Sequence, residues 1–375
     1  MARPGRHRLV KATVCHPSEL GEPDLGHWRR MQDDSPALRH PFLTAEFAQA
    51  FGESSKHARV AVVVEDGGSP LGYFAYNGNA LGVARPIGGR LGYRQGFVHA
   101  DDAAWSWAEL MRATGVHAVE FTDLVGSQTQ TGDGLAVNPS PIIDTTVGWD
   151  AYIAQARHHS DIRKAMQRAR RLEREHGPLE FSWGAVSAAE YAQLVAWKSE
   201  QYRRSGWPDP FARPWIRDVL DVLVDRSLGN LKVVSTTLRA GDDLVAADMS
   251  LVYHDVVAGW FSSYDDEYAR YSPGAIRRLR TIQSACEGNF AYIDLARGDE
   301  NYKQEFKNAD LNVATGLLRE RAGSALLYRS LHTPYTGTRA WILRRPRTRA
   351  FVRSTLRSLG SVRVRVRPNS RGTGR

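Results

Sequence analysis

Within residues 231–307 the spacing of apolar side chains changes from that of strands to that of a helix, and this change constrains the fold more than any other feature. The first part of the segment holds three runs rich in β-branched and aromatic residues: Leu231–Leu238, Leu244–Tyr253 and Val256–Tyr264. Such residues favour strands. Only short segments separate the runs, so we expect two successive hairpins.

A helix is expected directly after these strands. Four apolar residues recur on one helical face: Ala275, Leu279, Ile282 and Cys286. Ser272-Pro273 is typical of a helix start and Gly288 of a helix end. Phe290–Leu295 then has the composition of a strand, and the spacing of Tyr302 and Phe306 indicates a second short helix. The predicted order is β-β-β-α-β-α.

This order predicts a β-α-β crossover, so the strands on either side of the long helix should run parallel. The turn Ala269–Gly274 then lies at a strand's carboxyl end and at a helix N-terminus, where backbone amides and the helix dipole favour a phosphate. Gly274 leaves room for a ligand and Arg270 can add a cation. The alternative is an ordinary capped helix that binds no ligand.

Two runs carry a family resemblance: YDDEYARYSPG at Tyr264–Gly274 and IDLARGDENYK at Ile293–Lys303. Together they resemble the signature of the CelD-type acetyltransferases of cellulose and other exopolysaccharide synthesis. That family is a branch of the GNAT superfamily related to Fem-type peptidyl transferases. The resemblance covers most of residues 25–310 and is densest in 150–307. The usual GNAT pyrophosphate loop, Gln/Arg-x-x-Gly-x-Gly/Ala, is matched only by Arg270 and, one place early, by Gly274.

The resemblance implies an acyltransferase that uses acetyl-CoA or another acyl-CoA as co-substrate, without a metal. Its expected acceptor is a sugar, polysaccharide or cell-envelope precursor, acylated on nitrogen or oxygen. The CoA-binding residues are expected in the turn before the helix: Arg270, Tyr271, Ser272, Pro273 and Gly274.

Cysteine content and hydropathy exclude several classes of protein. Cys15 and Cys286 are the only cysteines, so neither a disulfide framework nor a cysteine-based metal cluster is expected. No run has the length of a membrane-spanning helix, and the first residues lack a secretory apolar region. We therefore expect a cytoplasmic protein.

The positive charge is concentrated at the C-terminal end. The chain has a net charge of +9, and the segment from Arg339 to Arg375 carries twelve arginines and no acidic residue, which leaves −3 for residues 1–338. Nucleic-acid binding by the folded core is therefore not expected. The tail is either a solvated extension or a segment that binds an anionic membrane surface.

An internal repeat is also predicted. Strands at Arg59–Glu65 and Leu71–Tyr76, a helix at Ala103–Arg112 and a strand at His117–Phe121 form a degenerate copy of the second half. The fold class is therefore α/β (α+β), with two tandem GNAT-like domains whose mixed sheets are flanked by helices. The expected domains are residues 1–145 and 146–335, followed by a basic tail at 336–375. Asp123–Pro141 is rich in turn residues and is predicted to be a loop between the copies.

A long basic helix is expected at Ser160–Glu175, whose arginines either face solvent or contact a phosphate. Its apolar face is expected to hold Ile162, Ala165, Met166, Ala169 and Leu172. The strand Leu179–Trp183 and two helices, at Ala188–Arg204 and from Arg213 to about Asp225, then complete the order β-α-α-β-β-β-α-β-α. This is the GNAT order.

Acyl transfer from CoA needs a base for the acceptor and an acid for the departing thiolate. The candidate catalytic residues are Asp248, Asp294, Glu300, Tyr302 and Lys303. Tyr302 lies where GNAT enzymes carry the tyrosine that protonates the thiolate, and it could instead pack against Phe306. Asp294 could be a satisfied buried carboxylate, and Glu300 with Lys303 a surface pair.

Three further residues are candidates for acceptor binding: Arg297, Trp197 and Lys198. Trp207 and Trp260 could also stack on a sugar, although core packing is favoured for Trp260. Two other functions stay open beside the acyl-CoA enzyme. One is Fem-like aminoacyl transfer from aminoacyl-tRNA, and the other is a non-catalytic binding protein with a GNAT fold.

Overall fold

The computed structural model describes residues 11–65, 68–89, 91–130, 133–156, 158–225 and 229–319. The predicted basic tail lies outside these residues. Residues 11–198 and 213–319 belong to one compact unit, and residues 199–212 to a second. No helix among the described residues is both long and apolar enough to cross a membrane.

The first half of the larger unit contains seven strands and three α-helices: β1 Lys11–Cys15, α1 Glu22–Asp34, α2 Ala45–Ser54, β2 Ala58–Val64, β3 Pro70–Asn77, β4 Val83–Pro86, β5 Val98–His99, α3 Trp107–Thr114, β6 Ala118–Val125 and β7 Ala136–Asp144. The predicted strand–strand–helix–strand unit is present as β2, β3, α3 and β6. Helix α3 begins later than predicted, because Ser106 caps it by accepting a 3.2 Å hydrogen bond from the Glu109 amide.

The second half begins with α4 Trp149–Ala156, α5 Ser160–His176, β8 Leu179–Ala185, α6 Ala188–Ser205 and α7 Pro214–Asp225. It continues with β9 Leu231–Ala240, β10 Asp243–Tyr253, β11 Val256–Tyr264, α8 Pro273–Glu287, β12 Tyr292–Asp294, α9 Asn301–Phe306 and β13 Ala309–Arg319. From β8 to α9 the order is the predicted β-α-α-β-β-β-α-β-α. Strands β11 and β12 pair in parallel, which confirms the predicted crossover through α8.

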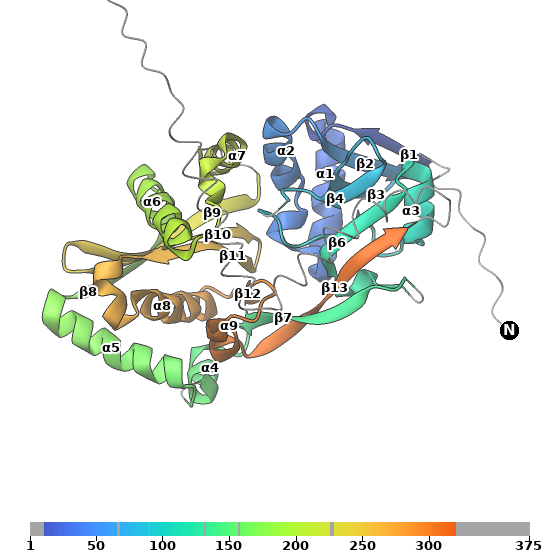
Figure 1. The fold of residues 1–375 in the computed structure, drawn as a ribbon. Coiled ribbons are helices and arrows are strands. Elements are labelled where there is room, and N and C mark those ends of the chain that lie inside the picture. The colour runs from blue at the N-terminus through green and yellow to red at the C-terminus, as the bar shows by residue number, and fades with distance from the viewer. Residues whose placement is uncertain are drawn as a thin grey trace, which may run out of the picture. The chain divides into compact units, whose positions relative to one another are not determined.

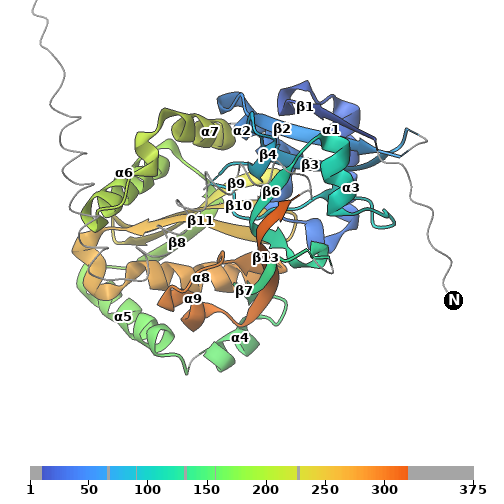
Figure 2. The ribbon, with the colours of Figure 1, turned by 45° about the vertical axis from the view of Figure 1, so that its right-hand side comes forward.

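One mixed sheet of thirteen strands runs through both halves in the order β1-β2-β3-β4-β6-β13-β7-β12-β11-β10-β9-β8, with β5 beside β3. The last strand, β13, lies between β6 and β7 (Figure 1). The sheet is flanked by helices: α8 packs across β8 to β12, and α5 packs on α8 and α9 on the same face (Figure 2). This mixed sheet flanked by helices is the predicted fold class.

The predicted loop Asp123–Pro141 is wrong at both of its ends, where strands replace it. Strand β6 continues to Val125, and β7 begins at Ala136 and pairs with both β12 and β13. Pro139 and Pro141 suggested a turn, because proline donates no backbone hydrogen bond. In the structure these prolines lie opposite Asn312 and Asp310 of β13, a strand that the sequence did not predict.

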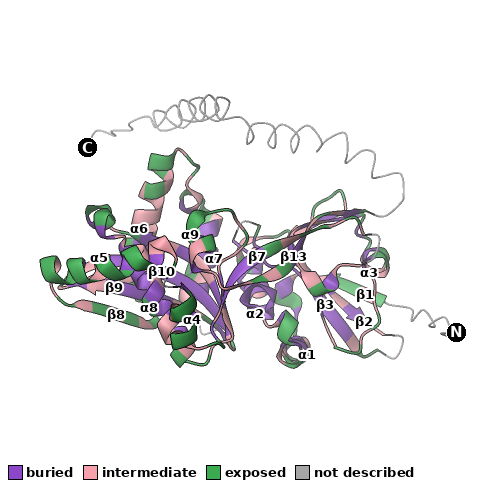
Figure 3. Cartoon of the chain, turned by 90° about the horizontal axis from the view of Figure 1, so that it is seen from below, coloured by how far each residue is buried: buried purple, intermediate pink, exposed green. Residues whose placement is uncertain are grey.

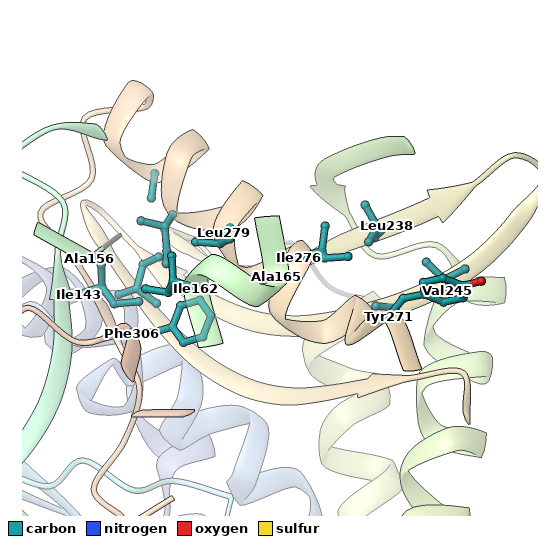
Figure 4. Packing of buried hydrophobic residues seen from close by; sticks show 14 of the residues in the cluster. Ile143, Ala156, Ile162, Ala165, Leu238, Val245, Tyr271, Ile276, Leu279 and Phe306 are labelled. Carbon is teal, nitrogen blue, oxygen red and sulfur yellow. The ribbon is translucent and has the colours of Figure 1, made fainter. Parts of the chain in front are cut away.

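The core of the second half lies between the sheet and helices α5 and α8. Ile162, Leu172 and Ile282 are fully buried there, beside Leu279 and Phe306 (Figure 4). Burying one such aliphatic side chain contributes about 1.5–3 kcal/mol, so this layer fixes α8 on the sheet. The outer face of α5 is exposed, whereas most of β10 is buried (Figure 3).

Helix α5 confirms the predicted stripe of buried residues except at Met166, whose side chain is 42% exposed. In the separate unit, residues 199–212 include the end of α6 and a 3-10 turn at Pro210–Ala212. Gly206 has a φ of 71°, and the Trp207 amide donates to the Tyr202 carbonyl at 3.0 Å, which ends the helix.

Candidate active site

Strands β11 and β12 lie side by side only over three residue pairs, from Val256–Tyr292 to Ala258–Asp294. Beyond this point β11 continues to Tyr264, and no other described strand pairs with that edge. Strand β11 has a bulge at the same place: Met249 of β10 lies opposite Phe261 and Ser250 opposite Gly259, so Trp260 is an extra residue that bends β11. Unpaired strand groups can hydrogen-bond an extended ligand. The two strands therefore separate beside the start of α8.

The turn before α8 has an unusual backbone. Ser272 has φ 55° and ψ 53°, a left-handed conformation that only glycine adopts without strain. Ser272 is the N-cap residue and Pro273 the first residue of the helix, as predicted, although the Ser272 side chain forms no capping hydrogen bond. Its hydroxyl instead accepts a hydrogen bond from Arg168 of α5. A Cβ on Gly274 would meet only the Tyr264 ring, at 3.5 Å. The first turn of α8 is therefore open on this side.

Arg270 and Tyr271 form a network with the end of α5. The Arg270 guanidinium lies 4.6 Å from the Tyr271 ring centroid and pairs with Glu175 at 3.2 Å. Tyr271 is buried, and its hydroxyl contacts Glu175 and, at 3.0 Å, His176. Hydrogen bonds from Tyr271 and Arg171 lower the pKa of Glu175 to about 2. Arg270 must therefore exchange Glu175 for any phosphate that it binds.

Tyr302 of α9 lies beside the second turn of α8. The Arg278 guanidinium is 4.2 Å from the Tyr302 ring centroid, and the side chain is 37% exposed. Burial raises the pKa of its phenol, so the hydroxyl is protonated at neutral pH. Among the described residues the hydroxyl has no hydrogen-bond partner. A protonated, accessible phenol can donate a proton to a leaving thiolate.

Asp248 is at the centre of a buried polar cluster. It pairs with Arg277 of α8 at 3.4 Å and accepts a 2.6 Å hydrogen bond from Ser250. Arg277 also donates to Ser262 of β11 at 3.2 Å, next to the separated strands. Burial lowers the pKa of Lys198 on α6, and the charge of Asp248 opposes that shift. The charge of Asp248 also raises the pKa of Tyr302, which brings Asp248, Lys198 and Tyr302 into one electrostatic environment.

Asp294, by contrast, is enclosed by residues from the first half of the unit. It is fully buried, pairs with Arg94, and lies 3.2 Å from His40 Nε2. Burial alone would raise the pKa of Asp294, but Arg94 and His40 hold it well below its usual range. An ionised carboxylate with these partners is a weak base. The contacts therefore favour the satisfied buried carboxylate over a catalytic role.

The loop between β12 and α9 contains three more of the predicted residues. Arg297 pairs with Asp123 of β6 at 2.7 Å, so its charge is already engaged. Lys303 is buried, and its ammonium lies 3.1 Å from exposed Glu300 and 3.4 Å from the Arg297 carbonyl. These contacts stabilise the loop that precedes Tyr302. They favour the alternative in which Glu300 and Lys303 form an ion pair without a catalytic role.

The tryptophans differ in their surroundings. Trp260 donates from Nε1 to the Leu91 carbonyl at 2.8 Å and its ring contacts Phe42, which supports core packing. Trp207 is 53% exposed and belongs to the separate unit. Trp197 is half-buried on α6.

Four ionisable residues at or near the site were not predicted from the sequence: His40, Arg94, Arg277 and Arg278. One feature of the sequence could have indicated Arg277 and Arg278. Two cations near a helix N-terminus oppose the helix dipole, so their presence there is unexpected. No feature of the sequence indicated His40 or Arg94, because they reach Asp294 from 254 and 200 residues away. Within the described residues there is no group of His, Cys, Asp and Glu suited to a metal ion.

The crossover through α8 and the separated strands are features of a GNAT-type acyltransferase fold. Residues 160–304 match the family model described as an acetyltransferase (GNAT) domain. This segment is therefore a GNAT domain, and the protein is an acyltransferase. No curated protein matches the sequence.

Solved structures share the fold at low sequence identity. FemX has a TM-score of 0.55 and 10% identity, over 85% of this chain and 99% of FemX. A conserved protein of unknown function from Bacteroides thetaiotaomicron has a TM-score of 0.52 and 10% identity, over 80% and 98% of the two chains. The C-terminal domain of a putative lysylphosphatidylglycerol synthetase from Agrobacterium fabrum has a TM-score of 0.50 and 12% identity, over 82% and 94%.

Proposed function

We propose that this protein transfers an acyl group from acetyl-CoA or another acyl-CoA to an amine or hydroxyl of a sugar, polysaccharide or envelope precursor. The observation that carries the proposal is the Tyr302 phenol, protonated and accessible beside the second turn of α8. A thioester that enters between β11 and β12 would leave its thiolate near such an acid.

The donor is assigned to the start of α8. Helix N-termini bind phosphates through free amides and the helix dipole, and Gly274 leaves the first turn open. Arg168, which reaches Ser272 from α5, and Arg270 can supply cations to a pyrophosphate. Tyr271 and Pro273 are both buried and would shape the turn rather than contact a ligand.

Asp248 and Lys198 are the candidates for receiving the acceptor's proton. Burial favours the neutral form of Lys198, and a neutral amine can act as a base. Trp197, the neighbour of Lys198 on α6, is a candidate for acceptor binding. The polysaccharide or envelope class of acceptor rests on the resemblance to CelD-type enzymes.

Transfer from aminoacyl-tRNA is the second candidate, because the fold is shared with FemX and with the putative lysylphosphatidylglycerol synthetase domain. Identities of 10% and 12% establish a common fold and no common substrate. The net charge of −3 on residues 1–338 argues against tRNA binding by the core.

A thermal-shift screen with acetyl-CoA, longer acyl-CoAs and aminoacyl-tRNA tests the proposal. We expect an acyl-CoA to raise the melting temperature, because ligands that bind only the folded state stabilise it. Release of free CoA in the presence of candidate sugars then reports transfer. Stabilisation by aminoacyl-tRNA alone would favour the second candidate. The absence of any response would contradict both and favour a non-catalytic GNAT-fold protein.

A further inference from the structure

Two consecutive arginines of α8, Arg277 and Arg278, lie beside the proposed catalytic residues with an incomplete set of partners. The Arg277 side chain is 3% exposed, and its Nε has no hydrogen-bond acceptor. Its other nitrogens bond Asp248, Ser262 and the hydroxyls of Thr236 and Thr281. A buried N–H without an acceptor is unfavourable, so this atom identifies a position where an acceptor would be stabilised.

Arg278 is the less buried of the two. Among the residues that the structure describes, its guanidinium donates no hydrogen bond and forms no ion pair. It contacts the rings of Tyr302 at 4.2 Å and Phe306 at 5.2 Å. Aromatic rings attract a cation more weakly than a carboxylate or phosphate does, and they leave all five N–H donors of the guanidinium unused.

The local charge is unbalanced as a result. Arg277 and Arg278 both interact with the same carboxylate, that of Asp248. Two guanidinium cations beside one anion in a buried region leave an excess of positive charge, which disfavours the free state. An anionic ligand would remove the excess and supply acceptors to both guanidinium groups.

The position of the pair distinguishes it from the CoA phosphates. Arg278 lies six residues after Ser272, or about 9 Å further along the helix axis. Phosphates bind at the first turn of a helix, whereas Arg278 lies at the Tyr302 phenol. We propose that Arg277 and Arg278 form a subsite for an anionic group, a carboxylate or a phosphate, of the acceptor. This assignment rests on the proposed function, and its test includes acetyl-CoA for that reason.

The test compares Arg278→Met with Arg278→Lys and with Arg280→Met. Methionine retains an unbranched chain over the Tyr302 ring without the charge, and lysine restores the charge. Arg280 is exposed on the same helix, so Arg280→Met is the matched control. The probes are inorganic phosphate and acetate, titrated into the full-length protein by calorimetry at constant ionic strength. The tail arginines are common to all variants and cancel in the comparison.

We expect one of the two anions to bind the wild type and Arg280→Met equally and to bind Arg278→Met at least tenfold more weakly, with partial recovery in Arg278→Lys. The anion that binds identifies the group as phosphate or carboxylate. Equal affinity in all variants, or binding of neither anion, would overturn the subsite.

Acetyl-CoA separates this proposal from the function on which it rests. We expect Arg278→Met to bind acetyl-CoA as the wild type does, and phosphate or acetate to bind with acetyl-CoA already present. The assignment to the acceptor is wrong if Arg278→Met weakens acetyl-CoA binding tenfold, or if acetyl-CoA displaces the anion. Either result would show that the guanidinium groups bind the donor. Failure of wild-type protein to bind acetyl-CoA would instead contradict the proposed function.

Discussion

Tyr302 has the environment that a proton donor needs, and replacing it separates chemistry from packing. Tyr302→Phe keeps the ring beneath Arg278 and removes a hydroxyl that has no hydrogen-bond partner among the described residues. We expect kcat to fall about 100-fold or more, a typical loss for a general acid, with an unchanged melting temperature. Tyr191→Phe is the control, because among the described residues the Tyr191 hydroxyl bonds only Asp221, at 2.9 Å. Full activity of Tyr302→Phe would assign the residue to packing.

His40 predicts the direction of the protein's response to acid. Burial lowers the pKa of His40 below its ordinary value of about 6.5. Below that pH the unfolded chain binds a proton that the folded protein resists, so the free energy of unfolding decreases as the pH falls. The loss from one such histidine is at most about 1.4 kcal/mol for each pH unit.

We therefore expect His40→Gln to reduce the difference in unfolding free energy between pH 7.5 and pH 5.5, measured by denaturant titration. His57→Gln is the control, since His57 is exposed. A pH dependence that is equal in wild type and His40→Gln would show that another group is responsible. Asp294, whose pKa is also lowered, acts in the same direction only at lower pH, as the pH falls below about 4.

Residue roles that depend on distant partners could not be predicted from the sequence. The catalytic role of Tyr302 rests on its position after β12 and stays a prediction, and its contact with Arg278 was not expected. Asp294 was also a candidate catalytic residue in the sequence, yet its role depends on Arg94 and His40, which come from the first half of the unit. A spacing rule does not detect a partner 200 residues away.

At the level of elements, α8 and its preceding turn give a test of donor binding. Gly274→Val adds a branched side chain to the first turn, where a Cβ would meet only the Tyr264 ring at 3.5 Å. The variant should fold, because the added atoms point away from the buried face of α8, and its side chain should obstruct a phosphate. We expect at least tenfold weaker binding of CoA by calorimetry. Unchanged affinity at an unchanged melting temperature would remove the pyrophosphate from this turn.

Elements with a strong local period were predicted closely, and those fixed by distant pairing were missed. Strands β9 to β11 and helix α8 follow from alternation and helical spacing within their own residues. Strands β7 and β13 do not follow from such patterns. Strand β7 contains two prolines, and β13 forms by pairing with β6 and β7. Their stability comes from strands that are far away in the sequence.

For the larger unit as a whole, β13 is the connection between the two copies of the repeat. Its pairing with β6 and β7 makes one sheet from both halves, and the Arg94–Asp294 and Arg297–Asp123 pairs connect them again beside the site. The first copy therefore supports the loop that precedes Tyr302, which gives that copy a structural role. The proposed boundary between residues 145 and 146 stays a prediction.

The arginine-rich segment of residues 339–375 lies outside the described residues, and its role is a prediction for the complete chain. Twelve arginines without an acidic residue would attract an anionic membrane surface, where envelope precursors are assembled. Each arginine near such a surface contributes about 1 kcal/mol, and salt weakens the attraction. We expect removal of residues 339–375 to leave CoA binding intact and to abolish salt-sensitive sedimentation with liposomes that contain phosphatidylglycerol.

Liposomes of phosphatidylcholine alone are the control for charge, and neither form of the protein should sediment with them. Equal sedimentation of the truncated and full-length proteins with the anionic liposomes would contradict the membrane role. Duplex DNA added as a competitor at the same salt concentration tests the other polyanion that twelve arginines could bind. DNA that removes the protein from the liposomes at a DNA-phosphate concentration far below the lipid-phosphate concentration would show that the segment binds nucleic acid in preference to the membrane.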